Sequence, residues 1–241
     1  MFTWLAETIQ YLKDASEYTP FNDVLAARTA PYLPQNAHVC DAGCGLGYLT
    51  LALAPLCKRV TAVDVSADAL AVLRENIFKT GAKNIEVLER DVFCLPNSVR
   101  FDAMVFCFFG SIPDTLRSVR AHCRGKAVLF QKNWKTHRFS IKETPLEKFT
   151  FAMSCAELDA LGIRYDCESF ALEMGQPFRS LADAKTFFRL NNRDAAQDET
   201  ALSAMERRLI ATGSGEFPYY LPANRQVGMI VVDAAGLPDP I

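Results

Sequence analysis

The chain has 241 residues, of which half are hydrophobic and 22% are charged, and its formal net charge is −2. This composition is typical of a folded globular protein, so it excludes a largely disordered chain, a collagen or a coiled coil. A nearly neutral chain also gives no general reason to expect binding to nucleic acid or to a membrane surface. The length favours a single domain over residues 1–241 rather than two sizeable ones.

The sequence shows neither targeting nor metal-binding signals. Residues 1–7 contain no basic region followed by an apolar run, and no segment reaches the roughly 20 apolar residues of a membrane helix. The eight cysteines form no C-x-x-C pair, and the three histidines lie far apart. This pattern predicts reduced thiols, no metal site and a cytoplasmic location.

Residues 1–33 are expected to form two helices that meet at a Thr-Pro turn and act as an N-terminal helical cap. From there on, apolar strands alternate with helical segments. The expected strands cover residues 38–41, 59–64, 84–88, 101–107, 126–131, 164–174 and 226–233. The expected helices cover residues 47–56, 67–79, 113–123, 145–161, 181–191 and 198–212.

This alternation predicts right-handed βαβ units, and hence an α/β fold with a mostly parallel sheet of seven strands covered by helices on both faces. Residues 179–224 interrupt it, because two helices are expected there before the last strand. We interpret this helical insertion either as a lid or substrate cap, or as an extension that packs on the sheet.

The most informative motif is the run from Asp41 to Gly47, Asp-Ala-Gly-Cys-Gly-Leu-Gly, which joins the first strand to the next helix. Glycines at such a turn allow positive φ angles and let a ligand approach the backbone closely. In an open parallel sheet, ligands bind outside the carboxyl ends of the strands where the strand order reverses. The motif therefore predicts a nucleotide-like cofactor.

Two further acids are expected at the same edge of the sheet. Asp64 ends the second strand, 21 residues after Gly43, where a carboxylate can accept hydrogen bonds from ribose hydroxyls. Asp91 follows the third strand and can accept a hydrogen bond from an adenine amine. The alternative for Asp91 is a loop carboxylate that caps a turn.

A nicotinamide dinucleotide and S-adenosylmethionine both combine adenine, ribose and a glycine turn. The dinucleotide fingerprint is G-x-G-x-x-G, whereas here position 48 is Tyr and the glycines follow the spacing G-x-G-x-G. A pyrophosphate at this turn would lie close to the like charge of Asp41, while a sulfonium with an α-ammonium would be attracted to it. Spacing and charge both favour S-adenosylmethionine.

On these residues the chain resembles a class I S-adenosylmethionine-dependent methyltransferase of the small-molecule type, which carries a D-x-G-x-G-x-G loop. The resemblance covers residues 35–175 clearly and the last strand more loosely. It implies a Rossmann-like sheet of strand order 3-2-1-4-5-7-6 with an antiparallel last strand. It also implies that Asp41, Gly43 and Gly45 line the methionine, Asp64 holds the ribose, Val65 packs on the adenine, Asp91 and Val92 bind its edge, and Cys107 and Phe108 lie beside the sulfonium.

The methyl acceptor leaves weaker signals. Residues 117–142 carry eight Lys or Arg and no acid, so the loop after the fifth strand either attracts an anionic substrate or is a solvated loop. His137 in this loop is a weak candidate for a general base. Five aromatic residues are candidates for an acceptor pocket or for ordinary core packing: Tyr18, Phe21, Trp134, Tyr219 and Tyr220.

The sequence predicts a methyltransferase that acts on a small-molecule acceptor. The alternatives are a non-catalytic S-adenosylmethionine-binding subunit, an RNA or protein methyltransferase, and a nicotinamide oxidoreductase. The segment after the fourth strand lacks the N/D-P-P-Y/F/W motif of enzymes that methylate amines of nucleic acids and glutamine. Cys107 also lacks the preceding proline of the attacking thiol in cytosine C5 methyltransferases.

Overall fold

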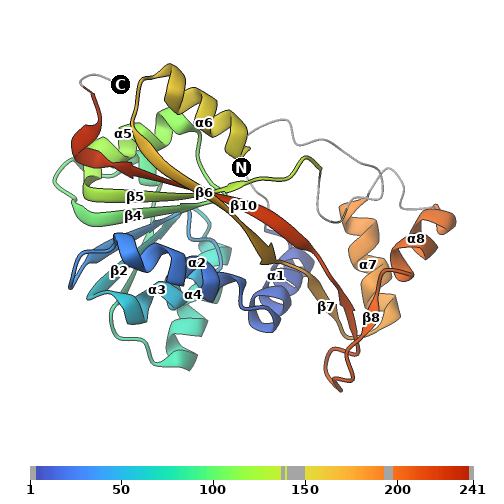
Figure 1. Cartoon of the computed structure of the whole chain (residues 1–241). Coiled ribbons are helices and arrows are strands. Elements are labelled where there is room, and N and C mark those ends of the chain that lie inside the picture. The colour runs from blue at the N-terminus through green and yellow to red at the C-terminus, as the bar shows by residue number, and fades with distance from the viewer. Residues whose placement is uncertain (1–3, 137–138, 140–149, 193–197, 239–241) are drawn as a thin grey trace.

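The computed structural model describes residues 4–136, 139, 150–192 and 198–238, and Figure 1 shows its arrangement. A sheet of seven strands forms its centre. These strands are β1 (His38–Ala42), β2 (Arg59–Asp64), β3 (Ile85–Glu89), β4 (Phe101–Cys107), β5 (Cys123–Lys132), β6 (Tyr165–Glu173) and β10 (Asn224–Asp233).

The order of the strands is β3-β2-β1-β4-β5-β10-β6. The first five are parallel to one another, and β10 is antiparallel to both of its neighbours, β5 and β6. Because β10 is the seventh strand of this sheet along the chain, the predicted order 3-2-1-4-5-7-6 is confirmed. The Rossmann-like α/β fold is confirmed with it.

Helices cover both faces of the sheet. On one face lie α2 (Phe21–Thr29), α3 (Tyr48–Leu53) and α4 (Ala67–Thr80), and on the other lie α5 (Ile112–His122) and α6 (Phe151–Ala160). Alternate residues of each strand supply the two cores. In β4, Ala103 and Val105 pack in the first core, whereas Met104 and Phe106 pack in the second.

Local signals in the sequence set several helix ends as predicted. The Ser66 hydroxyl accepts a hydrogen bond from the Ala69 amide at the start of α4, and Gly81 ends that helix at a φ of +70°. The helix predicted over 145–161 starts later: α6 begins at Phe151, where the Thr150 hydroxyl accepts from the Met153 amide. The predicted capping box at Thr144 lies outside the described residues.

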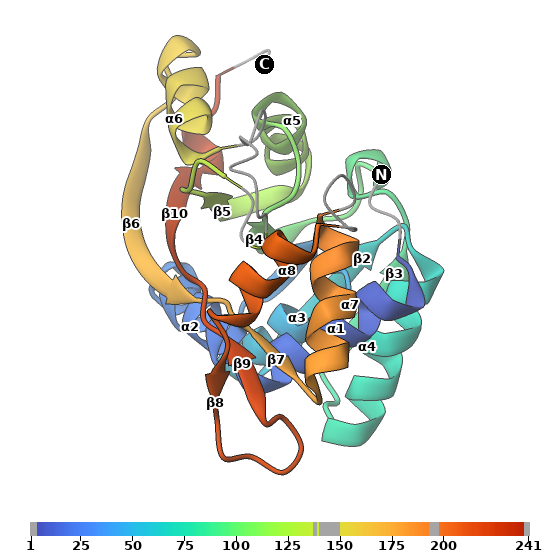
Figure 2. The same cartoon turned by 90° about the vertical axis from the view of Figure 1, so that its right-hand side faces the viewer.

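Strands β6 and β10 are long and extend beyond the other strands, as Figures 1 and 2 show. We call the segment that joins them, residues 174–223, the β6–β10 connection. It contains β7 (Gln176–Phe178), α7 (Leu181–Asn191), α8 (Glu199–Glu206), β8 (Ile210–Ala211) and β9 (Tyr219–Leu221). Its three short strands form a separate sheet of order β7-β9-β8.

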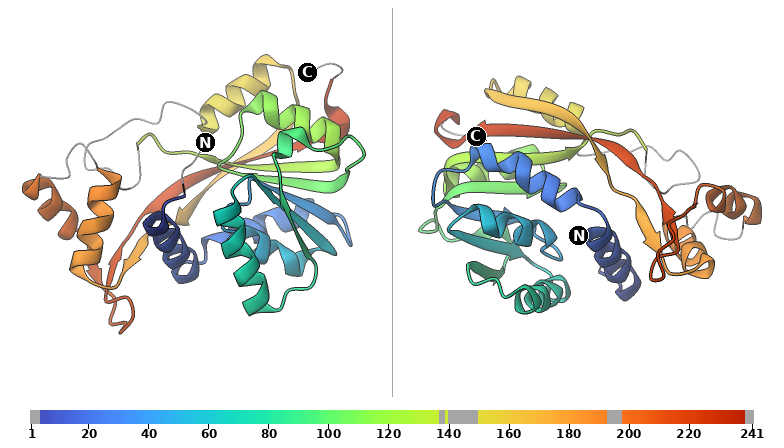
Figure 3. Two further views of the ribbon diagram at one scale, coloured as in Figure 1. Left: turned by 180° about the vertical axis from the view of Figure 1, so that it is seen from behind. Right: turned by 60° about the horizontal axis from the view of Figure 1, so that its bottom comes forward.

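The region expected to be a helical insertion, residues 179–224, thus contains the helices α7 and α8 and also the short strands β8 and β9. Helix α8 was predicted to run to residue 212, but it ends at Glu206 because Ile210 and Ala211 pair with β9 instead. The connection has an apolar core of its own around Phe178, Phe187 and Phe188. This core also includes Tyr11 from α1 (Ala6–Tyr18), and Figure 3 shows α1 between the connection and the main sheet.

Within the part of the chain that the structure describes, every helix is too short or too polar to cross a lipid bilayer. This finding agrees with the absence of a long apolar run in the sequence.

One glycine of the sheet tests how tightly α6 packs on β10. A Cβ atom at Gly228 would lie 2.1 Å from the Phe151 ring, so Gly228→Ala forces the ring or the strand to move. We expect a loss of about 1–3 kcal/mol in the free energy of unfolding, measured by urea denaturation. Gly236→Ala is the control, because nothing lies within 4 Å of a Cβ there. Equal stabilities of the two variants would contradict this packing.

Candidate functional site

The run from Asp41 to Gly47 forms a tight turn at the carboxyl end of β1. The amides of Gly43 and Cys44 both donate to the carbonyl oxygen of Val63 in β2, at 2.8 and 3.1 Å. Gly43 has a φ of +68°, and a Cβ atom there would lie 2.6 Å from the Phe109 ring. The turn therefore needs glycine for its backbone conformation and for its packing.

Asp41, the first residue of this run, is buried, with 1% of its surface exposed. Its Oδ2 atom accepts a hydrogen bond from the Thr50 hydroxyl of α3 at 2.5 Å. The pKa of Asp41 is raised to about 6, mainly because the carboxyl is buried. The Thr50 hydrogen bond lowers this pKa and the negative charge of Asp64 raises it. Among the described residues, no Lys, Arg or His forms an ion pair with Asp41.

Asp64 ends β2 and holds the same turn in place. Its Oδ2 atom accepts from the Gly45 amide and its Oδ1 atom accepts from the Ser66 amide, both at 2.9 Å. Each carboxylate oxygen has a second lone pair, so these bonds leave capacity for ligand hydroxyl groups. The next side chain, Val65, is 44% exposed and gives a small apolar surface beside the acid.

The carboxyl end of β4 lies next to the same turn, because β4 pairs with β1 from Val39–Ala103 to Ala42–Phe106. Burial is the main cause that raises the pKa of the Cys107 thiol, and the charge of Asp41 adds to it. Cys107 is therefore a neutral thiol and a poor nucleophile. Phe108 has a φ of +53°, and its ring meets Trp134 edge-on with centroids 5.7 Å apart.

Taken together, the strand ends present a buried carboxylate without a cationic partner, a second carboxylate with open lone pairs, and an exposed apolar side chain. These groups suit a ligand that carries positive charge, hydroxyl groups and a flat apolar ring. Comparison with known proteins agrees with this interpretation of the site. Residues 39–126 match a family model described as a methyltransferase domain. This stretch of the chain is thus similar in sequence to methyltransferase domains.

Individual relatives match only parts of this chain. It is 28% identical over 141 residues to a ubiquinone biosynthesis O-methyltransferase of Aromatoleum aromaticum, which covers 52% of this chain and 59% of the relative. It is 33% identical over 82 residues to a carboxy-S-adenosyl-L-methionine synthase of Dichelobacter nodosus, which covers 33% and 35%. The chain thus spans well under two thirds of either relative.

A solved structure confirms the fold over a larger part of the chain. The YcgJ protein of Bacillus subtilis superposes with a TM-score of 0.57, covering 88% of this chain and 97% of that protein, at 14% identity. This likeness concerns the fold alone.

The structure brings most of the predicted site residues to one edge of the sheet. Asp41, Gly43, Gly45, Asp64, Val65, Cys107 and Phe108 lie at the carboxyl ends of β1, β2 and β4 or directly after them. Asp91 is exposed and caps a 3₁₀ turn, because its Oδ1 atom accepts from the Phe93 amide at 2.9 Å. Val92 is buried, so its backbone amide is the group left to bind an adenine edge.

The residues predicted to bind the methyl acceptor do not all lie together. Tyr18 packs on Tyr220 with centroids 5.0 Å apart, whereas Trp134 packs on Phe108. The Tyr18–Tyr220 pair and the Trp134–Phe108 pair are thus two aromatic groups rather than one pocket. His137 lies outside the described residues, so its part as a base stays a prediction.

Sequence reasoning missed two residues beside the glycine turn. Thr50 binds Asp41, and the Trp4 ring lies over Gly45, where a Cβ atom would be 3.2 Å from the indole. Thr50 had a usable signal, because it follows Asp41 by nine residues at a strand-to-helix turn. Trp4 had none, since only the tertiary packing of α1 brings it there.

The pKa of Asp41 predicts a pH dependence for a cationic ligand. Ionised Asp41 attracts the α-ammonium of S-adenosylhomocysteine, so the ligand lowers this pKa from about 6, and its affinity rises as the pH rises towards 7. We expect an increase of up to about tenfold between about pH 5 and about pH 7 by isothermal titration calorimetry.

Asp41→Asn should flatten this profile. The stability of the ligand-free protein should show the opposite trend, because burial disfavours the ionised form in the folded chain. The free energy of unfolding should therefore fall as the pH rises from about 4 to about 6, and the Asn variant should lose that slope as well. An affinity that does not change with pH would show that Asp41 does not bind the α-ammonium of the ligand.

Proposed function

We propose that this chain binds S-adenosylmethionine and transfers its methyl group to a small-molecule acceptor. The observation that carries the proposal is the buried carboxylate of Asp41, which has no cationic partner among the described residues and lies below the glycine turn. A dinucleotide pyrophosphate would add a like charge there, whereas a cationic amino-acid group supplies the missing opposite charge.

The residues present fit such a cofactor. Asp41, Gly43 and Gly45 would hold the methionine part, and the free lone pairs of Asp64 would accept from the ribose hydroxyls. Val65 would cover the adenine, and the Asp91 carboxylate with the Val92 amide would bind its edge. When bound, the cofactor supplies a methyl group that is already activated on a sulfonium.

The protein's main task is then to hold the acceptor in line with that methyl group. Correct placement of two reacting groups can contribute roughly 7–11 kcal/mol to lowering a barrier. Cys107 takes no part as a nucleophile, because burial keeps its thiol protonated. The residues of this chain thus bind, orient and exclude water, and a general base is optional.

We place the acceptor beyond the ends of β4 and β5. An open groove there is lined by Lys132, Asn133, Trp134, Lys135, Thr150, Ala152 and Met153. Its aromatic wall, Trp134, contacts Phe108, which directly follows Cys107. The exposed Lys135 supports a preference for an anionic small molecule. The net charge of −2 and the relative named for ubiquinone biosynthesis support a small acceptor over RNA.

A thermal-shift experiment tests the cofactor. At a hundredfold excess over its dissociation constant a ligand stabilises a protein by about 2.7 kcal/mol, so S-adenosylhomocysteine should raise the melting temperature clearly. NADPH should leave it unchanged. Asp64→Ala should remove most of the shift, because it loses both the Gly45 amide contact and the ribose acceptor. Asp68→Ala, at an exposed position of α4, is the matched control.

A labelling experiment tests the reaction and the acceptor site. The protein is incubated with methyl-labelled S-adenosylmethionine and an extract of small metabolites, and labelled products are identified by mass spectrometry. Trp134→Leu should raise the acceptor KM at least about tenfold, since a lost aromatic contact costs about 1.4 kcal/mol or more. The affinity for S-adenosylhomocysteine should stay within twofold.

Phe78→Leu is the control for this variant, because Phe78 is an aromatic residue that is 89% exposed on α4. Label found only in RNA, with a binding affinity that falls steeply with salt, would favour the RNA alternative. Tight binding of S-adenosylhomocysteine without any labelled product in any acceptor pool would favour the non-catalytic subunit.

A further inference from the structure

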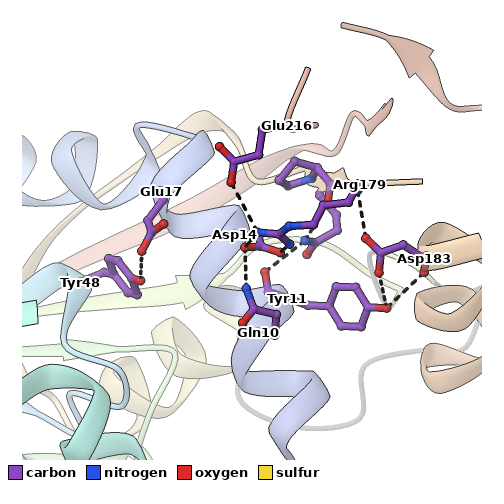
Figure 4. Close-up of polar contacts among 10 residues, drawn as sticks. Gln10, Tyr11, Asp14, Glu17, Tyr48, Arg179, Asp183 and Glu216 are labelled. Atoms are coloured by element: carbon purple, nitrogen blue, oxygen red, sulfur yellow. Dashed lines mark hydrogen bonds and ion pairs between the residues drawn. The ribbon is translucent and has the colours of Figure 1, made fainter. Parts of the chain in front are cut away.

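Helix α1 buries few of its residues. Of Ala6–Tyr18, only Tyr11, Asp14 and Ala15 are buried. The partly buried Ile9 and Leu12 pack in an apolar cluster that includes Leu46 of the glycine turn. Polar contacts of α1 add to this packing, and Figure 4 shows that they go in two directions.

One set of contacts ties α1 to the β6–β10 connection. The Arg179 guanidinium donates to both carboxylate oxygens of Asp14, with Nη2 at 2.8 Å from Oδ1, and the Asp14 side chain is 4% exposed. The Tyr11 hydroxyl donates to Asp183 Oδ1 at 2.8 Å. The Gln176 amide donates to the carbonyl oxygen of Tyr11 at 3.1 Å. These bonds join α1 to β7 and to the start of α7.

The other set ties α1 to the glycine turn. The Tyr48 hydroxyl donates to Glu17 Oε1 at 2.6 Å, and Tyr48 is the first residue of α3, directly after Gly47. At the amino end of α1, the Trp4 indole covers Gly45, whose amide binds Asp64. This helix and the residue Trp4 before it thus contact the connection on one side and the carboxyl-terminal part of the turn on the other.

We propose that Arg179 and Asp14 are positioning residues for cofactor binding: their ion pair fixes α1 on the β6–β10 connection and so holds Trp4 and Glu17 against the glycine turn. The inference rests on the proposed function, because the ligand it concerns is S-adenosylmethionine or its product. Neither Arg179 nor Asp14 lies in the glycine turn itself.

The physical reason is the cost of a buried charge. A carboxylate as buried as Asp14 is stable only when paired, and the bidentate guanidinium supplies two charge-assisted hydrogen bonds in a fixed geometry. Loss of the guanidinium leaves the Asp14 charge without its cation, although the Gln10 side-chain amide still donates to Oδ1 at 2.8 Å, so the carboxylate gains by moving towards water. Because Asp14 and Glu17 lie on one helix, that movement draws Glu17 and Trp4 from the turn.

The same linkage works in reverse. A ligand that holds Trp4 and Glu17 in place also favours the docked position of α1, and therefore the contacts of α1 with Arg179 and Asp183. Cofactor binding should accordingly order the β6–β10 connection, although its helices α7 and α8 lie apart from α3 and α4 (Figure 1).

The test uses Arg179→Gln, Glu17→Ala and the double variant of the full chain, with the dissociation constant for S-adenosylhomocysteine measured by calorimetry. Circular dichroism fixes a temperature at which each protein is folded. Arg179→Gln should weaken binding about tenfold and Glu17→Ala about fivefold. The double variant should be no more than about twofold weaker than Arg179→Gln, because both changes release the same helix.

Arg179→Lys should restore part of the affinity, because it keeps the charge but not the bidentate geometry. Arg117→Gln is the control, since Arg117 forms an exposed ion pair with Asp114 on α5. Hydrogen exchange supplies a second readout: S-adenosylhomocysteine should slow exchange of the α7 amides in the wild type and not in Arg179→Gln.

Three results would overturn the inference: an affinity of Arg179→Gln within twofold of the wild type, effects of Arg179→Gln and Glu17→Ala that multiply independently, or unchanged exchange in wild-type α7. If Arg179→Gln does not fold, Glu17→Ala alone decides, because Glu17 is exposed and its loss leaves the ion pair intact. If the wild-type protein binds no S-adenosylhomocysteine, that result refutes the proposed function and not the positioning role of Arg179 and Asp14.

Discussion

The candidate site depends on the reversal of strand order at β1. Strand β1 pairs with β2 on one side and with β4 on the other, so the chain leaves these strands towards opposite edges of the sheet. The carboxyl ends of β1, β2 and β4 are left open between the departing connections. Everything assigned to the site, from the glycine turn to Phe108, occupies that opening.

Hydrogen bonds between strand ends then fix the shape of the opening. Val63 accepts two amide bonds from the turn, and Asp64 accepts a third from Gly45. The acid at the end of β2 therefore has two roles that the sequence does not separate. One oxygen of Asp64 binds the Gly45 amide of the turn and the other binds the Ser66 amide at the start of α4, which leaves the second lone pair of each oxygen for a ligand.

The long antiparallel pair β6 and β10 adds a second level of organisation. It carries a small sheet and two helices away from the main sheet, with an apolar core of their own. Helix α1 lies between this unit and the main sheet, as Figure 3 shows, and contacts both. A helix that buries so few of its residues is suited to respond to a ligand, because part of its docking depends on a few polar contacts.

The sequence alone determined the sheet and the chemistry of its edge. Regular alternation of apolar strands and helices predicted a mostly parallel sheet, and the resemblance to class I methyltransferases implied its strand order. Ser66 and Gly81 marked the ends of α4 because caps depend on residues only three or four positions away. Tertiary structure decided what depends on distant residues. Asp14 binds Arg179, which lies 165 positions later in the chain. Residues at the end of a predicted helix form β8 instead, because they pair with β9. Asp41 likewise has its raised pKa because the folded chain surrounds it, and no local pattern records that burial.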